Sequence, residues 1–356
     1  MTERFLAFIR SAPEFYSALF DDLREARETI QIQIYCIERG GVAEDFKSIL
    51  IERAAAGVKV DLVYDSVGCI GMPFYFFKEL SEAGVNVIEY HPINPGRIKG
   101  PFSLRKLFRR NHRKIFLIDS HIYYLGGINL GERFIDWEDI MVRGEGGPAH
   151  DLKDSFTGVL GGRTPRLPLL IRPSESPVQV CDCRPMRRNY PIKRLYISSI
   201  KKSRKRVWIA QAYFIPRRKL VKALIRAVLR GVDVRVVIPD VSDVRIVDLA
   251  TWPSVKRLLR HGVKVGRFMD GMLHTKMALI EDNWLTVGTA NLDSMSFYWN
   301  LETNLVIRDP HLVKKAAQVF ADYEARSRVM GKEEPDERPL FLRALGKALY
   351  YYSWIL

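Results

Sequence analysis

Three features that often settle the class of a protein are missing from this sequence. No uncharged apolar run of about 18 residues occurs, so the sequence predicts no helix that spans a bilayer. Charged residues interrupt the first ten positions, which argues against a signal peptide. The four cysteines include no two pairs at zinc-ligand spacing, so we expect neither a metal site nor a disulfide framework. Reduced thiols in a cytosolic compartment fit these cysteines best.

A relative shortage of acidic residues leaves the chain strongly basic. Its 356 residues include 56 lysines and arginines against 41 aspartates and glutamates, which gives a net charge of +15. This surplus favours polyanionic partners, namely nucleic acid, anionic membrane or phosphate-bearing substrates, and does not choose among them. The apolar content of 47% is typical of a globular protein, long enough for two domains or one large duplicated one.

One short motif occurs twice. The stretch LHTKMALIEDNW places His274 and Lys276 two residues apart at the start of a predicted strand, where both side chains face the same side. The stretch NHRKIFLIDSHIYYLGGINLGERF contains the same pattern 162 positions earlier. The matched residues are His112, Lys114, Asp119, Gly126, Gly127 and Asn129 in the first copy, and His274, Lys276, Glu281, Gly288, Thr289 and Asn291 in the second. A spacing shared over this whole span indicates an internal duplication.

The segments around each copy repeat as well. The strand-like segments IQIQIYCIE and VWIAQAYFIP align with Tyr35 opposite Tyr213. In each half a helix then ends in a glycine, Gly57 or Gly231, and leads directly into a strand. A second helix–glycine–strand unit follows before the motif. This shared order predicts an α/β architecture of two pseudo-symmetric halves, each with a largely parallel or mixed sheet.

The domain organisation follows from the repeat. We expect an N-terminal half at residues 1–178, a C-terminal half at residues 179–335 and a separate segment at residues 336–356. The last segment contains RPLFLRALGKALYYYSWIL, in which Leu342, Leu345, Leu349, Tyr352 and Leu356 share one helical face. It is too short and too charged to span a membrane, so we predict an amphipathic helix that lies in the membrane surface. The alternative is a helix that packs on the protein's own core.

The duplicated motif resembles the signature of the phospholipase D superfamily. The resemblance covers the chain from about Ile30 to Arg308, and segments such as HRKIFLID, GGINLGERF and QAYFIPRRKLVKAL are most similar to bacterial cardiolipin synthases. It implies two α/β/α sandwich halves packed together with one active site at their interface. It also implies that neither a metal nor a cofactor is needed.

The chemistry of a phosphodiester explains why two copies are needed. Without a metal, the protein must supply a nucleophile, an acid and positive charge around one phosphate. The resemblance implies that His112 attacks phosphorus to form a phosphohistidine and that His274 protonates the leaving alcohol and later deprotonates the acceptor. Lys114 and Lys276 would bind the non-bridging phosphate oxygens. The amides of Asn129 and Asn291 would assist them in binding phosphate.

Carboxylates complete the expected site. The resemblance implies an acidic residue roughly 28 positions after each histidine that orients the imidazole, and Asp139 and Glu302 meet this spacing. The motif acids Asp119 and Glu281 also belong to the predicted catalytic set, although an acid at this position can instead terminate the strand. Glu281 departs from the usual aspartate of the family, and Asp282, which follows it, is an alternative for the same role.

The resemblance implies a phosphatidyltransferase that moves a phosphatidyl group onto phosphatidylglycerol to make cardiolipin. The donor would be phosphatidylglycerol or phosphatidylethanolamine, and nucleic acid would not be an obligatory partner. Because the sequence predicts no membrane-spanning helix, we expect the protein to be peripheral on the cytoplasmic face of the cell membrane. Three alternatives stay open: a hydrolytic phospholipase D, a nucleic-acid phosphodiesterase and a non-catalytic protein that binds anionic membranes. The basic loop at residues 105–110 fits a lipid surface and a nucleic-acid backbone equally well.

Overall fold

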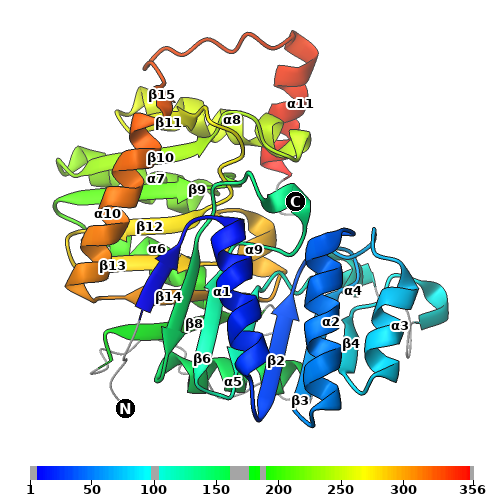
Figure 1. The fold of residues 1–356 in the computed structure, drawn as a ribbon. Coiled ribbons are helices and arrows are strands. Elements are labelled where there is room, and N and C mark those ends of the chain that lie inside the picture. Colours follow the sequence, from blue (N-terminus) through cyan, green and yellow to red (C-terminus); the bar gives the residue numbers. More distant parts are fainter. Residues whose placement is uncertain (1–5, 98–103, 161–175, 185–189, 353–356) are drawn as a thin grey trace.

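The computed structural model describes residues 6–97, 104–160, 176–184 and 190–352. The chain forms two α/β halves, each built on one mixed sheet (Figure 1). The predicted fold class is therefore confirmed. The first sheet has seven strands in the order β1-β7-β6-β5-β2-β3-β4, and the second has eight in the order β15-β11-β10-β9-β12-β13-β14-β8.

The first half runs from β1 to α5. Its strands are β1 (Leu6–Ile9), β2 (Thr29–Ile34), β3 (Lys59–Asp65), β4 (Asn86–Tyr90), β5 (Ile115–Ile118), β6 (Ile122–Gly126) and β7 (Met141–Glu145). Its helices are α1 (Ala12–Glu25), α2 (Gly41–Ala55), α3 (Phe74–Glu82), α4 (Leu104–Phe108) and α5 (Pro148–Leu160).

The second half repeats this order from β8 to α10. Its strands are β8 (Val178–Cys183), β9 (Arg206–Gln211), β10 (Asp233–Pro239), β11 (Lys264–Phe268), β12 (Lys276–Ile280), β13 (Trp284–Gly288), β14 (Glu302–Ile307) and β15 (Ser327–Val329). Its helices are α6 (Pro191–Lys202), α7 (Arg218–Leu229), α8 (Arg245–Arg260), α9 (Ser294–Tyr298) and α10 (Pro310–Ala325), and α11 (Leu340–Tyr351) follows.

The duplication extends further than the sequence indicates. In both halves three parallel strands neighbour a run of antiparallel ones, so that β2, β3 and β4 correspond to β9, β10 and β11. The edge strand β1 pairs antiparallel with β7, and β8 pairs antiparallel with β14 in the same way. The units β1–α1 and β8–α6 are therefore also copies. Because β8 opens the second sheet, we propose that the halves divide close to residue 178, as the sequence predicts.

The helix ends predicted at glycines are found as expected. Gly57, Gly84, Gly231 and Gly262 follow α2, α3, α7 and α8, with φ values of 87°, 92°, 84° and 82°. This left-handed conformation favours glycine and turns the chain directly into the next strand.

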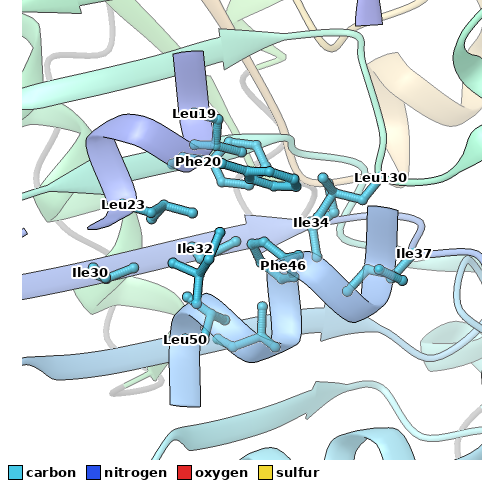
Figure 2. Packing of buried hydrophobic residues seen from close by; sticks show 14 of the residues in the cluster. Leu19, Phe20, Leu23, Ile30, Ile32, Ile34, Ile37, Phe46, Leu50 and Leu130 are labelled. Atoms are coloured by element: carbon cyan, nitrogen blue, oxygen red, sulfur yellow. The ribbon is translucent and has the colours of Figure 1, made fainter. Parts of the chain in front are cut away.

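Helices cover the outer face of each sheet, and the two inner faces share one core to which α5 and α10 also contribute. In the first half, Phe20 and Leu23 of α1 and Phe46 of α2 pack against Ile32 of β2 (Figure 2). The shared core joins side chains of both sheets, including Ile115, Leu117, Leu125, Val142, Met277, Leu279, Val287 and Leu305. The halves are consequently one packed unit, and residues at the ends of β5 and β12 are held close to each other.

A buried ion pair also joins the halves. Arg113 lies between the two motif residues His112 and Lys114, and its guanidinium donates to the Asp182 carboxylate on β8. Both side chains are almost completely buried. Asp182 also accepts hydrogen bonds from the Thr303 and Ser155 hydroxyls, at 2.8 and 3.1 Å. Among the described residues, the Arg113 guanidinium has one other side-chain acceptor, the Gln33 oxygen at 3.3 Å, which carries no charge.

We expect Asp182→Ala to lower the free energy of unfolding by about 3–5 kcal/mol, because it leaves a buried guanidinium without its counter-charge. Urea unfolding followed by circular dichroism measures the change. Asp21→Ala is the control, because its 3.2 Å pair with Arg24 is solvent-exposed and should contribute less than about 1 kcal/mol. Equal effects of the two substitutions would contradict a structural role of the buried pair.

Candidate active site

Backbone hydrogen bonds between the halves position both motif histidines. The His112 amide donates to the Leu301 carbonyl at 3.1 Å, and the Leu301 amide donates to the Arg110 carbonyl at 2.9 Å. The same bridge recurs in the other half: the His274 amide donates to the Glu138 carbonyl at 2.8 Å, and the Glu138 amide donates to the Met272 carbonyl at 2.9 Å. Each histidine segment therefore runs parallel to the segment that precedes a carboxylate of the opposite half.

The carboxylates consequently act across the interface. Glu302 Oε2 lies 3.1 Å from Nδ1 of His112, and Asp139 Oδ2 lies 2.5 Å from Nδ1 of His274. The sequence spacing counts each acid from the histidine of its own half, and the structure corrects that pairing: each acid contacts the histidine of the other half. The reason is the backbone bridge, which places Glu302 directly after Leu301 and Asp139 directly after Glu138.

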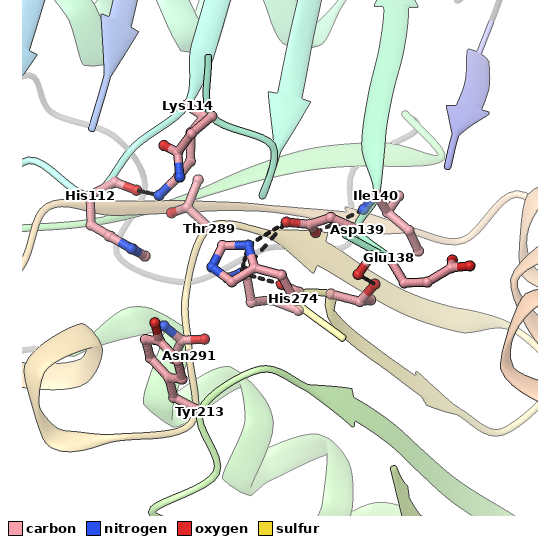
Figure 3. Close-up of polar contacts among 12 residues, drawn as sticks. His112, Lys114, Glu138, Asp139, Ile140, Tyr213, His274, Thr289 and Asn291 are labelled. Atoms are coloured by element: carbon pink, nitrogen blue, oxygen red, sulfur yellow. Dashed lines mark hydrogen bonds and ion pairs between the residues drawn. The ribbon is translucent and has the colours of Figure 1, made fainter. Parts of the chain in front are cut away.

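Because an ionised carboxylate only accepts hydrogen bonds, we assign the proton of each ring to Nδ1, although Lys276 Nζ also lies 2.8 Å from Nδ1 of His274. Both imidazoles and both carboxylates are buried. A carboxylate that accepts from Nδ1–H leaves Nε2 of the same ring free to act as nucleophile or base. Figure 3 shows His112, His274 and Asp139 in one cluster with Lys114.

The two motif lysines are buried beside the histidines. Lys114 Nζ donates to the His112 carbonyl at 2.9 Å, and Lys276 Nζ donates to the His274 carbonyl and lies 3.7 Å from Asp139. Burial, together with the charge of Lys276, lowers the pKa of Lys114 to about 7. Two lysines that destabilise each other in this way have high affinity for an anion placed between them.

The histidines are neutral at pH 7 for the same reason. Burial and Lys276 lower the pKa of His274 to about 4, and burial lowers the pKa of His112 although Glu302 opposes it. Burial alone would raise the pKa of Asp139, but Lys276 and His274 lower it below its usual value. The site without substrate therefore holds two neutral imidazoles beside ionised Asp139.

The predicted phosphate-binding asparagines occupy matched places in the two halves. Asn129 directly precedes Leu130, which forms a backbone bridge with Ile37 after β2. In the same way, Asn291 directly precedes Leu292, which forms a bridge with Phe214 after β9. The side-chain oxygen of Asn129 accepts from the Cys36 amide at 3.2 Å. The side-chain oxygen of Asn291 is buried and has no hydrogen-bond partner among the residues that the structure describes. The Asn291 side-chain oxygen is therefore free to accept a hydrogen bond from a ligand, whereas contact with a phosphate oxygen would have to come from its amide nitrogen (Figure 3).

The motif acids Asp119 and Glu281 are not near the histidines. Asp119 follows β5 at the end opposite Lys114, and its carboxylate accepts from the backbone amides of residues 27–29 at 2.8–3.3 Å. Glu281 accepts from the amides of Arg204 and Lys205 in the same way, at 2.8 and 3.0 Å. We therefore correct their place in the catalytic set to a structural role at a strand end.

The choice between Glu281 and Asp282 is also resolved by these contacts. Asp119 and Glu281 both have positive φ, 48° and 58°, and both accept hydrogen bonds from the chain that enters the neighbouring strand. Asp282 instead forms exposed ion pairs with Lys205 and Arg206 at 2.7 Å. The longer Glu281 side chain thus performs in the second copy what Asp119 performs in the first.

Three aromatic residues next to the imidazoles were not singled out for the site from the sequence. The ring of Tyr35 lies 4.7 Å from that of His112, and Lys114 Nζ lies over the Tyr35 ring at 5.0 Å. The rings of Trp137 and Tyr213 lie 5.0 and 6.2 Å from that of His274. The matched positions of the two tyrosines in the repeat were the signal that could have identified them.

The two copies differ at one position next to the carboxylates. Thr289 Oγ1 donates to Glu302 Oε2 at 2.5 Å, whereas its counterpart Gly127 has no side chain. A Cβ atom at Gly127 would lie 2.3 Å from the Asp139 carboxylate oxygens, so the missing side chain makes room for that carboxylate. Glu302 and Asp139 are consequently held in different ways.

Neither a metal site nor a membrane-spanning helix is found in the parts of the chain that the structure describes. No group of three or more His, Cys, Asp or Glu side chains within these ranges is arranged to hold an ion. None of the helices in the same ranges is both long enough and apolar enough to cross a bilayer.

Solved structures with a similar fold cover nearly the whole chain. The phosphatidylserine synthase of Haemophilus influenzae Rd KW20 superposes with a TM-score of 0.78 at 14% identity, over 99% of this chain and 95% of that one. The polyphosphate kinase of Porphyromonas gingivalis superposes with a TM-score of 0.65 at 17% identity, over 98% of this chain and 52% of that one. These likenesses show the fold.

Sequence relatives identify the family. The family described as "Cardiolipin synthase, PLD-like domain" matches twice, at residues 19–146 and 196–323. A cardiolipin synthase of Geobacillus sp. (strain WCH70) is 30% identical over 355 residues, which cover 95% of this chain and 69% of the relative. Cardiolipin synthase A of Pseudomonas putida (strain W619) is 33% identical over 306 residues, which cover 83% of this chain and 63% of the relative. The chain therefore belongs to the cardiolipin synthase family of proteins with duplicated phospholipase D-like domains.

Proposed function

We propose that this protein is a phosphatidyltransferase that makes cardiolipin from phosphatidylglycerol through a phosphohistidine. The observation that carries the proposal is the pair of crossed contacts, His112 with Glu302 and His274 with Asp139, beside two buried lysines. Two oriented imidazoles and two cations are what a phosphodiester transfer without a metal requires. Similarity to proteins named cardiolipin synthase supports phospholipid as the substrate class.

The first half-reaction breaks the bond from phosphorus to the headgroup. Nε2 of His112 donates its lone pair to phosphorus, and the headgroup oxygen leaves with its bonding electrons. His274, protonated at Nε2, gives its proton to that oxygen, so the alcohol departs neutral. Because the pKa of His274 is about 4 before substrate binds, we infer that the phosphate anion raises it by offsetting the two lysine charges.

The second half-reaction reverses the roles. Neutral His274 takes the proton from a hydroxyl of the acceptor phosphatidylglycerol, and the resulting oxygen attacks phosphorus. The phosphorus–nitrogen bond breaks and its electron pair returns to His112. Throughout, Lys114, Lys276 and Asn291 would bind the non-bridging oxygens. The products are cardiolipin and, when phosphatidylglycerol is also the donor, glycerol.

Lipid mass spectrometry tests the proposal. Purified protein incubated with phosphatidylglycerol vesicles should produce cardiolipin and glycerol. Phosphatidic acid and glycerol would show that water is the acceptor and that the protein is a hydrolytic phospholipase D. Vesicles that also contain phosphatidylethanolamine show from the released alcohol which lipid is the donor. Cleavage of a single-stranded oligonucleotide with no lipid turnover would replace the proposal by a nucleic-acid phosphodiesterase.

The pKa of Lys114 predicts a pH dependence. The charged form is needed to bind phosphate, and it is lost as the pH rises through about 7. The value of kcat/KM reports ionisations of the free enzyme. Above pH 7 we expect the slope of log kcat/KM against pH to become more negative by about one. In Lys114→Arg the guanidinium stays charged, so the change of slope near pH 7 should disappear. An unchanged slope in both proteins would contradict the role of Lys114.

The helix α11 is the expected membrane contact, and its structure corrects the predicted face. One side packs against α8, where Gly346 lies so close that a Cβ atom would be 2.5 Å from the Leu249 carbonyl oxygen. Leu342 and Leu349, predicted to face the membrane, are partly buried on that side, and Leu356 lies outside the described residues. The large apolar residues exposed along α11 and directly after it are Leu340, Phe341, Leu345, Tyr351 and Tyr352.

We propose that this exposed face inserts into the membrane surface and holds the protein peripherally on the cytoplasmic side. All four cysteines are free thiols, which supports a reducing compartment. Phe341→Asp with Leu345→Asp should weaken binding to anionic vesicles at least tenfold, because each buried apolar side chain contributes about 1.5–3 kcal/mol. Vesicle sedimentation measures it, with Val329→Asp, exposed on β15, as control. Equal loss in the control would contradict the proposal.

A further inference from the structure

A pocket separate from the crossed histidine contacts lies between α6, the start of α7, α9 and α11. Its volume is about 420 Å³. The basic lining residues are Lys193, Arg217, Arg218 and Lys219, and the aromatic ones are Phe297, Tyr298, Tyr350 and Tyr351. No carboxylate is among the described residues that line it.

The four cations of this pocket form no salt bridge within the described part of the chain. Three of them lie against aromatic rings instead: Lys193 Nζ is 4.7 Å from the centre of the Tyr298 ring, Arg217 is 5.4 Å from the same centre, and Arg218 is 5.9 Å from that of Tyr351. Four like charges gathered without counter-charges repel one another, and an anion bound among them removes that cost. The first turn of α7, which carries Arg218 and Lys219, adds the positive end of a helix dipole.

The surroundings of Tyr350 show the same excess of positive charge. Burial raises the pKa of its phenol, and the opposing influences are Arg257, Arg218 and Arg217. The Tyr350 hydroxyl donates to the Pro216 carbonyl at 3.2 Å, which fixes this wall of the pocket against the start of α7. The pocket is therefore a built cavity whose charge is not balanced by the protein.

The position of the pocket indicates where an anion would come from. Tyr351 forms one wall and is also exposed at the end of α11, next to the apolar residues that we place in the membrane surface. A phospholipid whose phosphate is bound in this pocket can therefore keep its acyl chains in the bilayer. A soluble anion would gain nothing from the adjoining apolar helix.

We propose that this pocket binds the phosphate headgroup of an intact anionic phospholipid as a site additional to the catalytic one. The lipid is held by the four cations and the tyrosine rings, and it fixes the protein on the membrane through α6, α7 and α11. This site does not depend on which lipid reaction the histidines perform.

Binding stoichiometry tests the proposal without relying on turnover. The protein with His112→Ala is titrated calorimetrically with monomeric dihexanoyl phosphatidylglycerol. We expect two bound molecules per chain, and one after Lys193→Gln and Arg218→Gln are added. The matched control is Lys201→Gln with Lys202→Gln, which removes the same charge at the exposed end of α6 and should leave two. An unchanged stoichiometry in the pocket variant would overturn the proposal.

Vesicles and phosphate distinguish the lipid from other sources of the same anion. With His112 intact, the pocket variant should bind vesicles of equal parts phosphatidylcholine and phosphatidylglycerol about thirtyfold more weakly, because the two removed cations each contribute about 1 kcal/mol near such a surface. Its turnover of monomeric short-chain lipid should not change. Inorganic phosphate that displaces the second lipid at equal concentration would overturn the assignment to a lipid. A loss of the same size in the Lys201 and Lys202 control would overturn the proposal as well.

Discussion

His112→Ala is expected to lower the rate of phosphatidyl transfer on the order of 10⁵-fold, as removal of a nucleophile does in other enzymes with covalent intermediates. The imidazole is buried, oriented by Glu302 and accompanied by Lys114, so no other described side chain can take its place at phosphorus. Cardiolipin formed from phosphatidylglycerol vesicles and quantified by mass spectrometry measures the loss.

Two controls separate lost chemistry from lost structure in this experiment. The His112→Ala protein should stay folded, with a cooperative urea transition, and keep its binding to anionic vesicles, because neither α11 nor the shared core is changed. If it binds vesicles normally and retains more than about a hundredth of the activity, His112 is not the nucleophile. A non-catalytic membrane-binding protein would show no difference between the two forms in any assay.

Glu302→Gln is expected to lower the rate by about 10³–10⁴-fold, because the amide no longer holds His112 in the Nδ1–H tautomer. Glu302 lies in the second half of the chain, 28 residues after His274, yet its contact is with the histidine of the first half. The expected loss should therefore couple to His112 and not to His274.

A double-mutant cycle distinguishes the two pairings. Added to His112→Ala, the Glu302→Gln change should cost almost nothing further, because residues that act as a unit are not additive. Added to His274→Ala, it should lower the residual rate again. The mirror experiment uses Asp139→Asn, which should couple to His274. Coupling of Glu302 to His274 would contradict the crossed arrangement.

Most of the site could be predicted because the duplication preserves spacing. The matched positions of His112 and His274 identify the two imidazoles that the structure holds against carboxylates of the opposite half. The crossing of the carboxylates could not be predicted in this way. It depends on the backbone bridges between Leu301 and His112 and their counterparts, which form only when the halves pack together.

Other features escaped the sequence for local reasons. The strand β1 has only four residues, and the equivalence of β1–α1 with β8–α6 becomes visible only from their places in the two sheets. Asp119 and Glu281 share the motif spacing, but their side chains cap the backbone at the opposite end of the strand from the lysines. Spacing alone does not separate an acid that orients an imidazole from one that terminates a strand. Similarly, Arg110 looks like a surface cation in a basic loop, yet it is buried 3.5 Å from Asp65.

The most direct test of the account is to trap the covalent intermediate. His274→Ala is mixed with a phosphatidyl ester of nitrophenol, a leaving group that needs no protonation, and the intact protein is weighed by mass spectrometry. We predict a phosphatidyl adduct that peptide mapping places on His112, because its formation needs no acid whereas its transfer to an alcohol needs the missing base. An adduct on another residue would contradict the proposed mechanism. So would release of nitrophenol by this variant without an adduct, if the release continues when His112 is also replaced.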